Sequence, residues 1–277
     1  MSRGPARRKA LSPAHIAGIA AFVVAGGLLF VPGDLAAVPL GLFLLLCLTT
    51  PFVPRSGFFL PVISRGGRAG KAVALTFDDG PDPEVTPLLL DLLRRHRLRA
   101  TFFVAGRKAE RQPELVREIL RQGHTIGNHS FRHDPLLMLR SRARLADEIT
   151  RTQNLLASFG IRPLLFRPPV GVTNPRLPGV LRELGMECIT FSCRAPDFGN
   201  RKIGGLAEAI LRKVRPGAIV LLHDVSPSGG GVDTWFGEVE KIIATLKARG
   251  YDIVPLSGLI GRAVMEELPF PRCPRFA

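Results

Sequence analysis

Short apolar runs alternate with amphipathic segments along most of this chain, and no other feature of the sequence constrains its fold as strongly. The apolar runs have the length and composition of buried strands: Ala72–Thr76, Ala100–Val104, His124–Gly127, Leu164–Phe166, Glu187–Phe191, Ala218–Leu222 and Tyr251–Val254. The segments between them have helical periodicity: Pro87–Arg97, Glu110–Gln122, Ser141–Phe159, Pro175–Leu184, Leu206–Val214 and Val232–Arg249. Such repeated units predict an α/β fold with a parallel sheet, either a barrel or a doubly wound layer.

Both arrangements gather functional side chains at the carboxyl ends of the strands, so we expect functional residues directly after each run. Asp78 and Asp79 follow the first run, and Gly80 and Pro81 then turn the chain. Two adjacent carboxylates at the end of a buried strand are costly unless a cation lies beside them. An ordinary Asp-Gly turn with solvated carboxylates is the alternative for this segment alone.

Two histidines, His129 and His133, follow the third run. On a helical turn, a spacing of four residues places both imidazoles on one face, close enough to share a metal ion. Together with Asp79 they make an Asp-His-His set, which leaves coordination positions open for water, as in catalytic zinc sites. Two unrelated surface histidines are the alternative.

Three later strand ends also carry unusual residues. Arg167 begins the segment Arg-Pro-Pro-Val-Gly after the fourth run, Asp197 follows the fifth run, and His223 ends the sixth. An arginine can pair with a carboxylate in a fixed fork geometry, and a histidine next to a carboxylate can donate a proton. Taken singly, the Arg167 segment is also explained by a structural turn, and His223 by an ordinary buried core histidine.

In this order and spacing, the segments TFDDGP, HSFRH, RPPVG and LLH resemble those of polysaccharide deacetylases of the NodB-homology type, carbohydrate esterase family 4. The resemblance extends from Lys71 to about Val264. It implies a distorted (β/α)7 barrel that removes N-acetyl groups from amino sugars, releasing acetate, with a divalent metal that is usually zinc.

The resemblance also implies residue roles. Asp79, His129 and His133 would hold the metal, Asp78 would be the general base, and Arg167 would position that base. This fits the chemistry, because an amide carbonyl is a poor electrophile. A zinc ion polarises the carbonyl and lowers the pKa of its bound water toward ~7, which makes that water the nucleophile.

The remaining roles concern the substrate. The resemblance implies that the backbone N–H of Val170 helps to hold the oxyanion and that Leu221 lines the pocket for the acetyl methyl group. His223 would be the general acid that protonates the leaving amine, tethered by Asp197.

The sequence departs from the family pattern at Arg194, Phe198 and Val170, where many members have Asp, Trp and an aromatic residue. An added cation and a smaller rim favour a shorter, phosphate-linked glycan over long chitin-like or peptidoglycan chains. Two other functions stay open: removal of a formyl group from a lipid-linked sugar, and glycan binding without catalysis.

The N-terminal region differs in composition from the rest. After a basic start come two runs without acidic or basic side chains other than His15, Leu11–Gly33 and Leu35–Pro54, each long enough to cross a hydrocarbon core of about 30 Å. They predict a transmembrane helical hairpin, with a cleaved signal peptide as the alternative. Both flanks are positive, which places both ends in the cytoplasm, whereas a single span would place the catalytic domain outside.

The expected organisation is therefore a membrane anchor over residues 1–60, a linker over 61–70, a deacetylase domain over 71–265 and an irregular tail over 266–277. We expect an integral protein of a bacterial-type inner membrane, with its catalytic domain on the cytoplasmic face. Membrane lipid and an N-acetylated glycan are the expected partners, and the oligomeric state is not predicted.

The charge balance, 38 Lys and Arg against 23 Asp and Glu, gives a formal charge of +15. Nucleic acid is not an expected partner, because the basic residues are spread over polar helix faces and no helix-turn-helix or RNA-binding pattern is present. The 4 cysteines include no Cys-x-x-Cys pair, which excludes a zinc finger or a disulfide-stapled small domain.

Overall fold

The computed structural model describes residues 11–31, 33–67, 70–228 and 231–269. Its helices are α1 Pro13–Leu28, α2 Ala37–Thr49, α3 Val85–Arg95, α4 Gly106–Arg111, α5 Pro113–Arg121, α6 Arg142–Ala157, α7 Leu177–Glu183, α8 Leu206–Lys213, α9 Gly231–Ala248 and α10 Leu256–Ile260. Its strands are β1 Val62–Ile63, β2 Ala72–Asp78, β3 Thr101–Val104, β4 Thr125–Asn128, β5 Ile161–Pro163, β6 Leu165–Phe166, β7 Glu187–Ile189, β8 Cys193–Arg194, β9 Ile219–His223, β10 Asp252–Ile253 and β11 Met265–Glu267. The basic N-terminal cluster and the last part of the expected tail, 270–277, lie outside the described residues.

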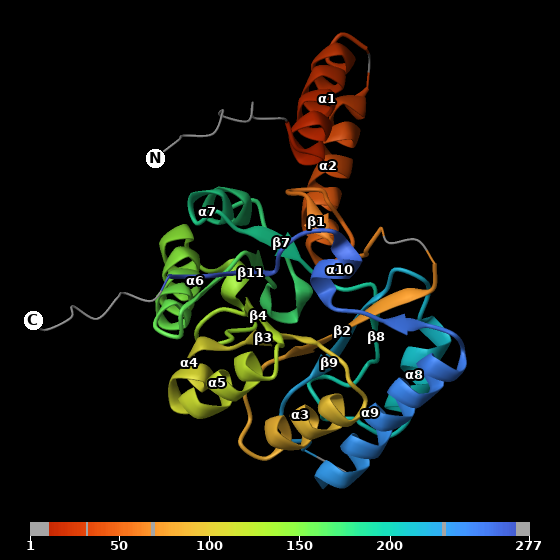
Figure 1. Ribbon diagram of the computed structural model, residues 1–277. Coiled ribbons are helices and arrows are strands. Elements are labelled where there is room, and N and C mark those ends of the chain that lie inside the picture. The colour runs from red at the N-terminus through yellow and green to blue at the C-terminus, as the bar shows by residue number, and fades with distance from the viewer. Residues whose placement is uncertain (1–10, 32, 68–69, 229–230, 270–277) are drawn as a thin grey trace, which may run out of the picture.

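The main sheet is parallel and follows the order β1-β7-β6-β4-β3-β2-β9-β8, and β10 pairs with β2 (Figure 1). Every apolar run expected to be a strand contains one, so the α/β class with a parallel sheet is confirmed. Only residues 190–192 separate β7 from β8, yet β7 pairs with β6 and β8 pairs with β9. One short stretch of chain therefore connects β8 at one end of the path with β7, the strand next to the other end, as in a sheet that curls into a distorted half-barrel.

The strands of the described residues do not form a regular seven-stranded ring. The last expected strand, β10, is two residues long and pairs only with Ala72 and Val73 at the start of β2, while β9 pairs with β2 from Ala74 onward. The strand β2 therefore has three partners, because β3 pairs with it only from Thr76 onward and β10 pairs with its first two residues.

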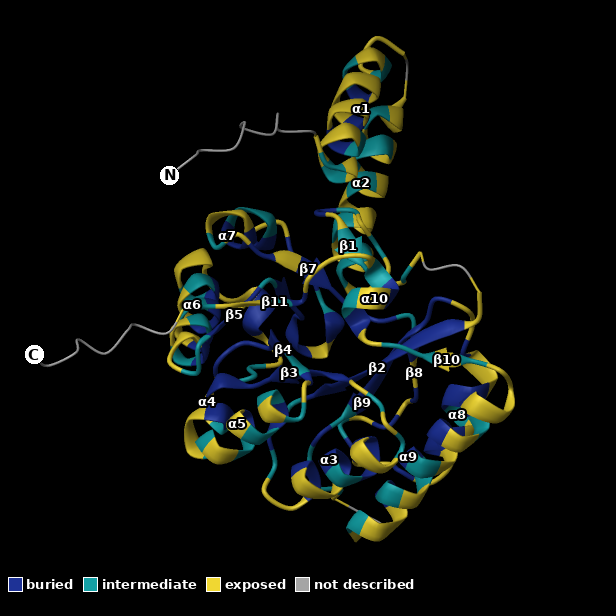
Figure 2. Cartoon of the chain, viewed as in Figure 1, coloured by how far each residue is buried: buried dark blue, intermediate teal, exposed yellow. Residues whose placement is uncertain are grey.

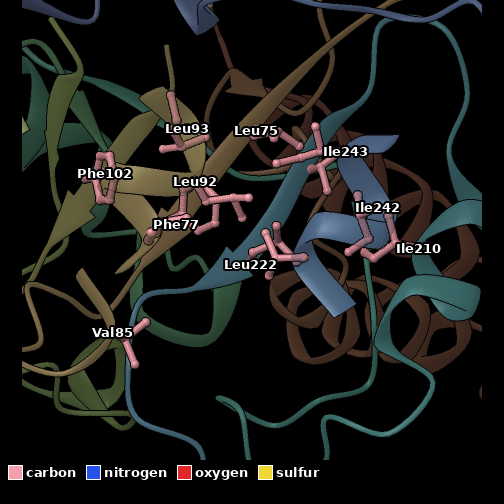
Figure 3. Close-up of a cluster of buried hydrophobic side chains, with 14 of the residues drawn as sticks. Leu75, Phe77, Val85, Leu92, Leu93, Phe102, Ile210, Leu222, Ile242 and Ile243 are labelled. Carbon is pink, nitrogen blue, oxygen red and sulfur yellow. The ribbon is translucent and has the colours of Figure 1, made fainter. Parts of the chain in front are cut away.

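Alternation along the strands divides the core into two layers. Val73, Leu75 and Phe77 of β2 pack outward in the cluster that covers the sheet. Figure 3 shows Leu75 and Phe77 with Leu92 of α3 in this cluster. The intervening alanines of β2 join an inner cluster with residues of neighbouring strands: Ala72, Ala74, Phe103, Leu165, Ile189, Ile219 and Leu221. Since successive side chains point to opposite faces of a strand, the next inward positions on β2 and β9 belong to polar residues at the strand ends.

Two expectations about local structure are corrected. The helix expected over 110–122 is broken into α4 and α5 at Gln112, whose φ of −127° is not helical. Pro113 begins α5 because proline has no backbone N–H to donate to the preceding turn. Short strands also occur where irregular chain was expected, since β1 pairs with β7 and β11 pairs with β5 in antiparallel fashion.

The N-terminal helices α1 and α2 lie side by side and project from the domain (Figure 1). Asp34–Phe52 is a continuous helical segment of 19 residues with a mean hydropathy of 2.1, and none of it is buried. Figure 2 shows this hairpin as mostly exposed or intermediate in burial. The helix α1 is apolar but has only 16 residues, about 24 Å at 1.5 Å per residue.

Candidate metal and catalytic site

The site lies where β2 ends. Asp78 is the last residue of β2 and is in register with His223 on β9, so these two strand ends are direct neighbours. Asp79 then adopts a left-handed backbone conformation with φ 72°, which is uncommon outside glycine. The chain thus changes direction between the two carboxylates, and each reaches a different set of partners.

Asp79 meets both histidines of the predicted metal set. Its Oδ1 lies 3.2 Å from Nε2 of His129 and 3.0 Å from Nε2 of His133. One ligand atom from each of the three residues lies within 4.8 Å of the others. The expectation that these side chains converge on one point is confirmed.

The donor set fits a metal ion. Nδ1 of His129 lies 2.6 Å from the carbonyl oxygen of Arg167, and since a carbonyl only accepts, this nitrogen carries the proton. Nε2 of His129 is then free to coordinate. Asp79 Oδ1 is buried and accepts no hydrogen bond with good geometry. Burial alone would raise the pKa of Asp79, but the two imidazoles lower it well below its usual range, so the carboxylate is ionised as a metal ligand must be.

The segment that carries the histidines is a loop, not the expected helical turn. Ser130 and His133 have positive φ values of 65° and 53°, which a helix does not permit. The loop is held instead by Glu148 of α6, whose Oε2 accepts hydrogen bonds from the backbone N–H of Phe131 at 3.1 Å and of Arg132 at 2.7 Å. The two imidazoles therefore converge through this carboxylate rather than through helical periodicity.

Sequence reasoning missed Glu148, although a signal was present. It is fully buried on α6, between Leu145 and Ile149 on the apolar face of that helix. A charged residue in an apolar stripe predicts a polar partner, because buried charges are otherwise strongly unfavourable.

We expect Glu148→Ala to weaken metal binding about 10- to 100-fold, the usual effect of losing a group that orients metal ligands. Glu148→Gln keeps an acceptor oxygen and should recover part of this loss. Metal titration of the chelated protein measures the effect, with the exposed Glu114→Ala on α5 as the control. A variant that unfolds at lower temperature but binds metal with unchanged affinity would limit Glu148 to a structural role.

Asp78 is held by Arg167, which is completely buried. Nη1 of Arg167 donates to Asp78 Oδ1 at 2.6 Å and to Thr76 Oγ1 at 2.9 Å, and Nη2 donates to the carbonyl of Thr190 at 2.9 Å. The guanidinium also lies over the ring of Phe103, 3.9 Å from its centroid. Burial lowers the pKa of Arg167, while the charge of Asp78 opposes this change. The second oxygen of Asp78 stays directed toward His129, at 3.7 Å from Nε2.

His223 and Asp197 form the second pair that the sequence predicted. Nδ1 of His223 lies 2.6 Å from Asp197 Oδ2, and both side chains are largely buried. Burial would lower the pKa of His223, but the carboxylate of Asp197 raises it above its usual value. Nδ2 of Asn200 donates to the carbonyl of His223 at 3.0 Å, a contact that sequence reasoning did not find.

Asp224, the next residue, points away from this pair. It is buried and accepts a hydrogen bond from the hydroxyl of Thr86, 2.8 Å from its Oδ2. Burial raises the pKa of Asp224 to about 7. The alternation along β9 thus gives two adjacent polar residues different surroundings.

The predicted substrate residues occupy different depths. Val170 is half-exposed with φ 52°, in the turn Pro169–Gly171, whereas Leu221 is buried inside the half-barrel, two residues before His223. No hydrogen bond or ion pair within the described part of the chain joins either residue to the metal set. Arg194 and Phe198, the departures from the family pattern, are both exposed.

The turn that contains Val170 also packs against the base of the N-terminal hairpin. The backbone N–H of Thr173 donates to the carbonyl of Pro51 at 3.2 Å, and the hydroxyl of Thr190 donates to the carbonyl of Pro54 at 2.6 Å. Thr190 in turn accepts from Arg167. A continuous set of contacts therefore connects the end of α2 with the residue that holds Asp78.

Comparison with known proteins supplies independent findings. A family model described as polysaccharide deacetylase matches residues 65–189. A peptidoglycan-N-acetylglucosamine deacetylase of Bacillus cereus is 35% identical over 192 residues, which are 69% of this chain and 88% of that protein. A chitooligosaccharide deacetylase of Azorhizobium caulinodans is 34% identical over 195 residues, 67% of this chain and 92% of that protein. The crystal structure of the Bc1960 peptidoglycan N-acetylglucosamine deacetylase matches with a TM-score of 0.66 and 31% identity, over 73% of this chain and 94% of that chain.

Proposed function

Because this chain belongs to the polysaccharide deacetylase family, we propose that it hydrolyses the N-acetyl group of an amino sugar in a glycan and releases acetate. The observation that carries this function is the convergence of Asp79, His129 and His133 beside a second, arginine-bound carboxylate. Glycans of the peptidoglycan and chitooligosaccharide types are the substrate classes that the relatives support.

We propose zinc as the metal, because two imidazole nitrogens and one carboxylate oxygen are ligands that zinc uses in catalytic sites. When bound by Asp79, His129 and His133, it supplies Lewis acidity for the amide carbonyl and for the attacking water. Dialysis against a chelator should remove acetate release, and adding back single divalent metals identifies the ion that restores it most fully.

The base in this proposal is Asp78. Arg167 occupies one of its oxygens, and the other faces the metal set, where it can accept a proton from the attacking water. Arg167 is in turn fixed by Thr76, Thr190 and the ring of Phe103, so the carboxylate has little freedom to rotate. This arrangement orients the base before the substrate arrives.

The acid in this proposal is His223, which protonates the leaving amine. Asp197 holds Nδ1, so Nε2 is the nitrogen left to donate, and the raised pKa keeps the ring charged to higher pH than a free imidazole. The backbone N–H of Val170 contributes to holding the oxyanion, and Leu221 provides an apolar surface for the acetyl methyl group.

Replacing Asp197 with Asn is expected to move the alkaline limb of the pH profile of kcat/KM to lower pH. The reason is that removal of the carboxylate lowers the pKa of His223, so the proton-donating form is lost earlier as the pH rises. Rate measurements across pH 5 to 10 with a soluble N-acetylated oligosaccharide measure this shift. An unchanged alkaline limb would show that Asp197 does not set the pKa of the general acid.

Acetate release from N-acetylated oligosaccharides by the metal-loaded protein tests the function directly. Stable, metal-loaded protein that binds a glycan but releases no acetate would favour glycan binding without catalysis. Release of formate from an N-formylated sugar with no release of acetate would favour the deformylase alternative.

We further propose that the α1–α2 hairpin anchors the protein in a membrane. The exposed apolar segment Asp34–Phe52 supports this, as does an apolar cleft of about 1120 Å³ between α1 and α7 that Ile19, Phe22 and Phe59 line in part. The contacts of Pro51 and Pro54 with the catalytic domain support the further proposal that the active site lies close to the membrane surface, within reach of glycans attached there. A topology reporter fused after Ala277 tests the cytoplasmic orientation that the flanking charges favour.

A further inference from the structure

A pocket of about 370 Å³ opens directly beside the metal set and is strongly basic. Asp79 and His133 form one side of it. The cationic residues of its lining are Arg107, Lys108 and Arg111 of α4 and Arg132 of the histidine loop. The function proposed above uses none of these four side chains.

The cations of α4 form no ion pair within the described part of the chain, although the charge of Lys108 lowers the pKa of the buried Asp224, against the larger effect of burial. Among the described residues, no carboxylate oxygen lies within 4.0 Å of the charged atoms of Arg107, Lys108 or Arg111, whereas many of the other exposed arginines form such pairs. Arg107 and Arg111 are also four residues apart on the helix, a spacing at which like charges repel. The cluster is therefore electrostatically incomplete in the protein alone.

Two carboxylates near Val225, another lining residue, make other contacts: Asp224 precedes Val225 in the chain, and Asp82 contacts Ser226, which follows it. Asp82 accepts hydrogen bonds from the hydroxyl and the backbone N–H of Ser226, at 2.8 and 3.2 Å. Asp224 is buried against Thr86. Arg132 alone of the four cations approaches a carboxylate, that of Glu148, with its Nε at 3.9 Å from Oε1.

The position of α4 relative to the metal set is fixed by backbone contacts. The N–H of Gly106 donates to the carbonyl of Ser130 at 2.9 Å, and the N–H of Arg107 donates to the carbonyl of Phe131 at 2.8 Å. A Cβ added at Gly106 would lie 2.5 Å from the Phe131 ring and 2.6 Å from the hydroxyl of Thr152. The close approach of α4 thus requires glycine there, and it holds the basic side chains next to the metal ligands.

We propose that this pocket binds a phosphate group carried by the glycan substrate, close to the N-acetyl group that is hydrolysed. This inference rests on the proposed function. A phosphate monoester carries a charge of about −1.5 to −2 at neutral pH and three strong acceptor oxygens. It can therefore accept hydrogen bonds from several of these cations at once, more than one carboxylate can. A neutral glycan would leave these exposed and partly exposed donors to water. A phosphate that joins a sugar to a lipid is a diester with one charge, whereas the phosphate of a soluble sugar is a monoester, but both offer anionic acceptor oxygens to these donors.

The first test is a binding measurement that does not depend on catalysis. Calorimetric titration of the chelated full-length protein with inorganic phosphate is expected to show saturable binding, and acetate at the same concentrations much weaker binding. The double variant Arg107→Gln/Lys108→Gln should weaken phosphate binding at least about 10-fold. The matched control Arg94→Gln/Arg95→Gln on α3 removes the same charge from another surface and should bind phosphate as the native protein does. Equal weakening in both double variants would overturn the pocket, because only overall charge would then matter.

The second test compares one N-acetylated oligosaccharide with and without a phosphate on its reducing end. The native protein is expected to have a KM about 10-fold lower for the phosphorylated compound, and Arg107→Gln/Lys108→Gln should bring the ratio of the two KM values close to 1. A still lower KM for the same sugar phosphate attached to a polyprenyl chain would identify a lipid-linked substrate. A KM that is not lowered further would identify a soluble one. Equal KM values for both oligosaccharides in the native protein would overturn the proposal but leave the deacetylase function intact. If neither compound releases acetate, the function fails, and the phosphate titration still decides the pocket.

Discussion

Asp79→Ala is expected to abolish metal binding at stoichiometric concentrations. It should also lower kcat/KM for acetate release by more than about 1,000-fold, which exceeds the usual loss for one electrostatic contact to a transition state. The physical reason is that Oδ1 of Asp79 lies 3.2 and 3.0 Å from the two imidazoles, so its loss removes the only anionic member of the donor set and leaves the imidazoles unpaired. Metal content by elemental analysis and acetate release are measured on the same preparation.

A matched control for this variant is Asp91→Ala. Asp91 is an exposed carboxylate of α3 that pairs with Arg94 and Arg95, so its loss should leave metal content and activity unchanged. His129→Ala should reproduce the effect of Asp79→Ala. Retention of one equivalent of metal and near-native activity in Asp79→Ala would exclude the proposed metal set.

Asp78→Asn is expected to reduce kcat about 10²- to 10⁴-fold while metal binding is retained, because the amide cannot accept a proton although it keeps the shape of the carboxylate. This variant also removes the counter-charge of the buried Arg167, and breaking a buried ion pair costs about 3–5 kcal/mol of stability. Chemical denaturation therefore has to accompany the rate measurement.

Thr76→Val separates these two effects. It removes the second acceptor of Arg167 Nη1, which lies 2.9 Å away, but leaves the base in place. We expect a loss of stability with kcat reduced less than about 10-fold, since the hydroxyl only supports the residue that positions the base. If the two variants, Asp78→Asn and Thr76→Val, lose activity only in proportion to their loss of stability, Asp78 is not the base.

The strand-end positions of the functional residues could be predicted because they follow from local rules. Buried parallel strands are apolar runs, and parallel strands end together at one edge of the sheet, so polar residues just after them must lie near one another. Asp78 beside His223, and Asp79 beside His129, are consequences of that rule.

The conformation of the histidine loop could not be predicted in this way. The spacing of His129 and His133 suggested a helical turn, whereas the loop bends at Ser130 and His133 and is held by Glu148 from a helix that begins nine residues further on. The same spacing brings two imidazoles together in either conformation, so the three side chains converge as expected although the predicted local structure was wrong.

The sequence by itself determined the α/β class and the strand-end positions of Asp79, His129 and His133, because these rest on residue type and on position relative to a strand. The pairing of His223 with Asp197 was implied by the family resemblance. The family resemblance implied that Arg167 acts on Asp78, 89 residues away, but tertiary structure decided its complete burial there. Tertiary structure alone decided the closeness of the α4 cations to Asp79 and His133. It also decided that the base of the hairpin touches the Val170 turn. These contacts join segments distant in the chain, and their energies depend on which groups packing removes from water, a property that no local pattern of residues carries.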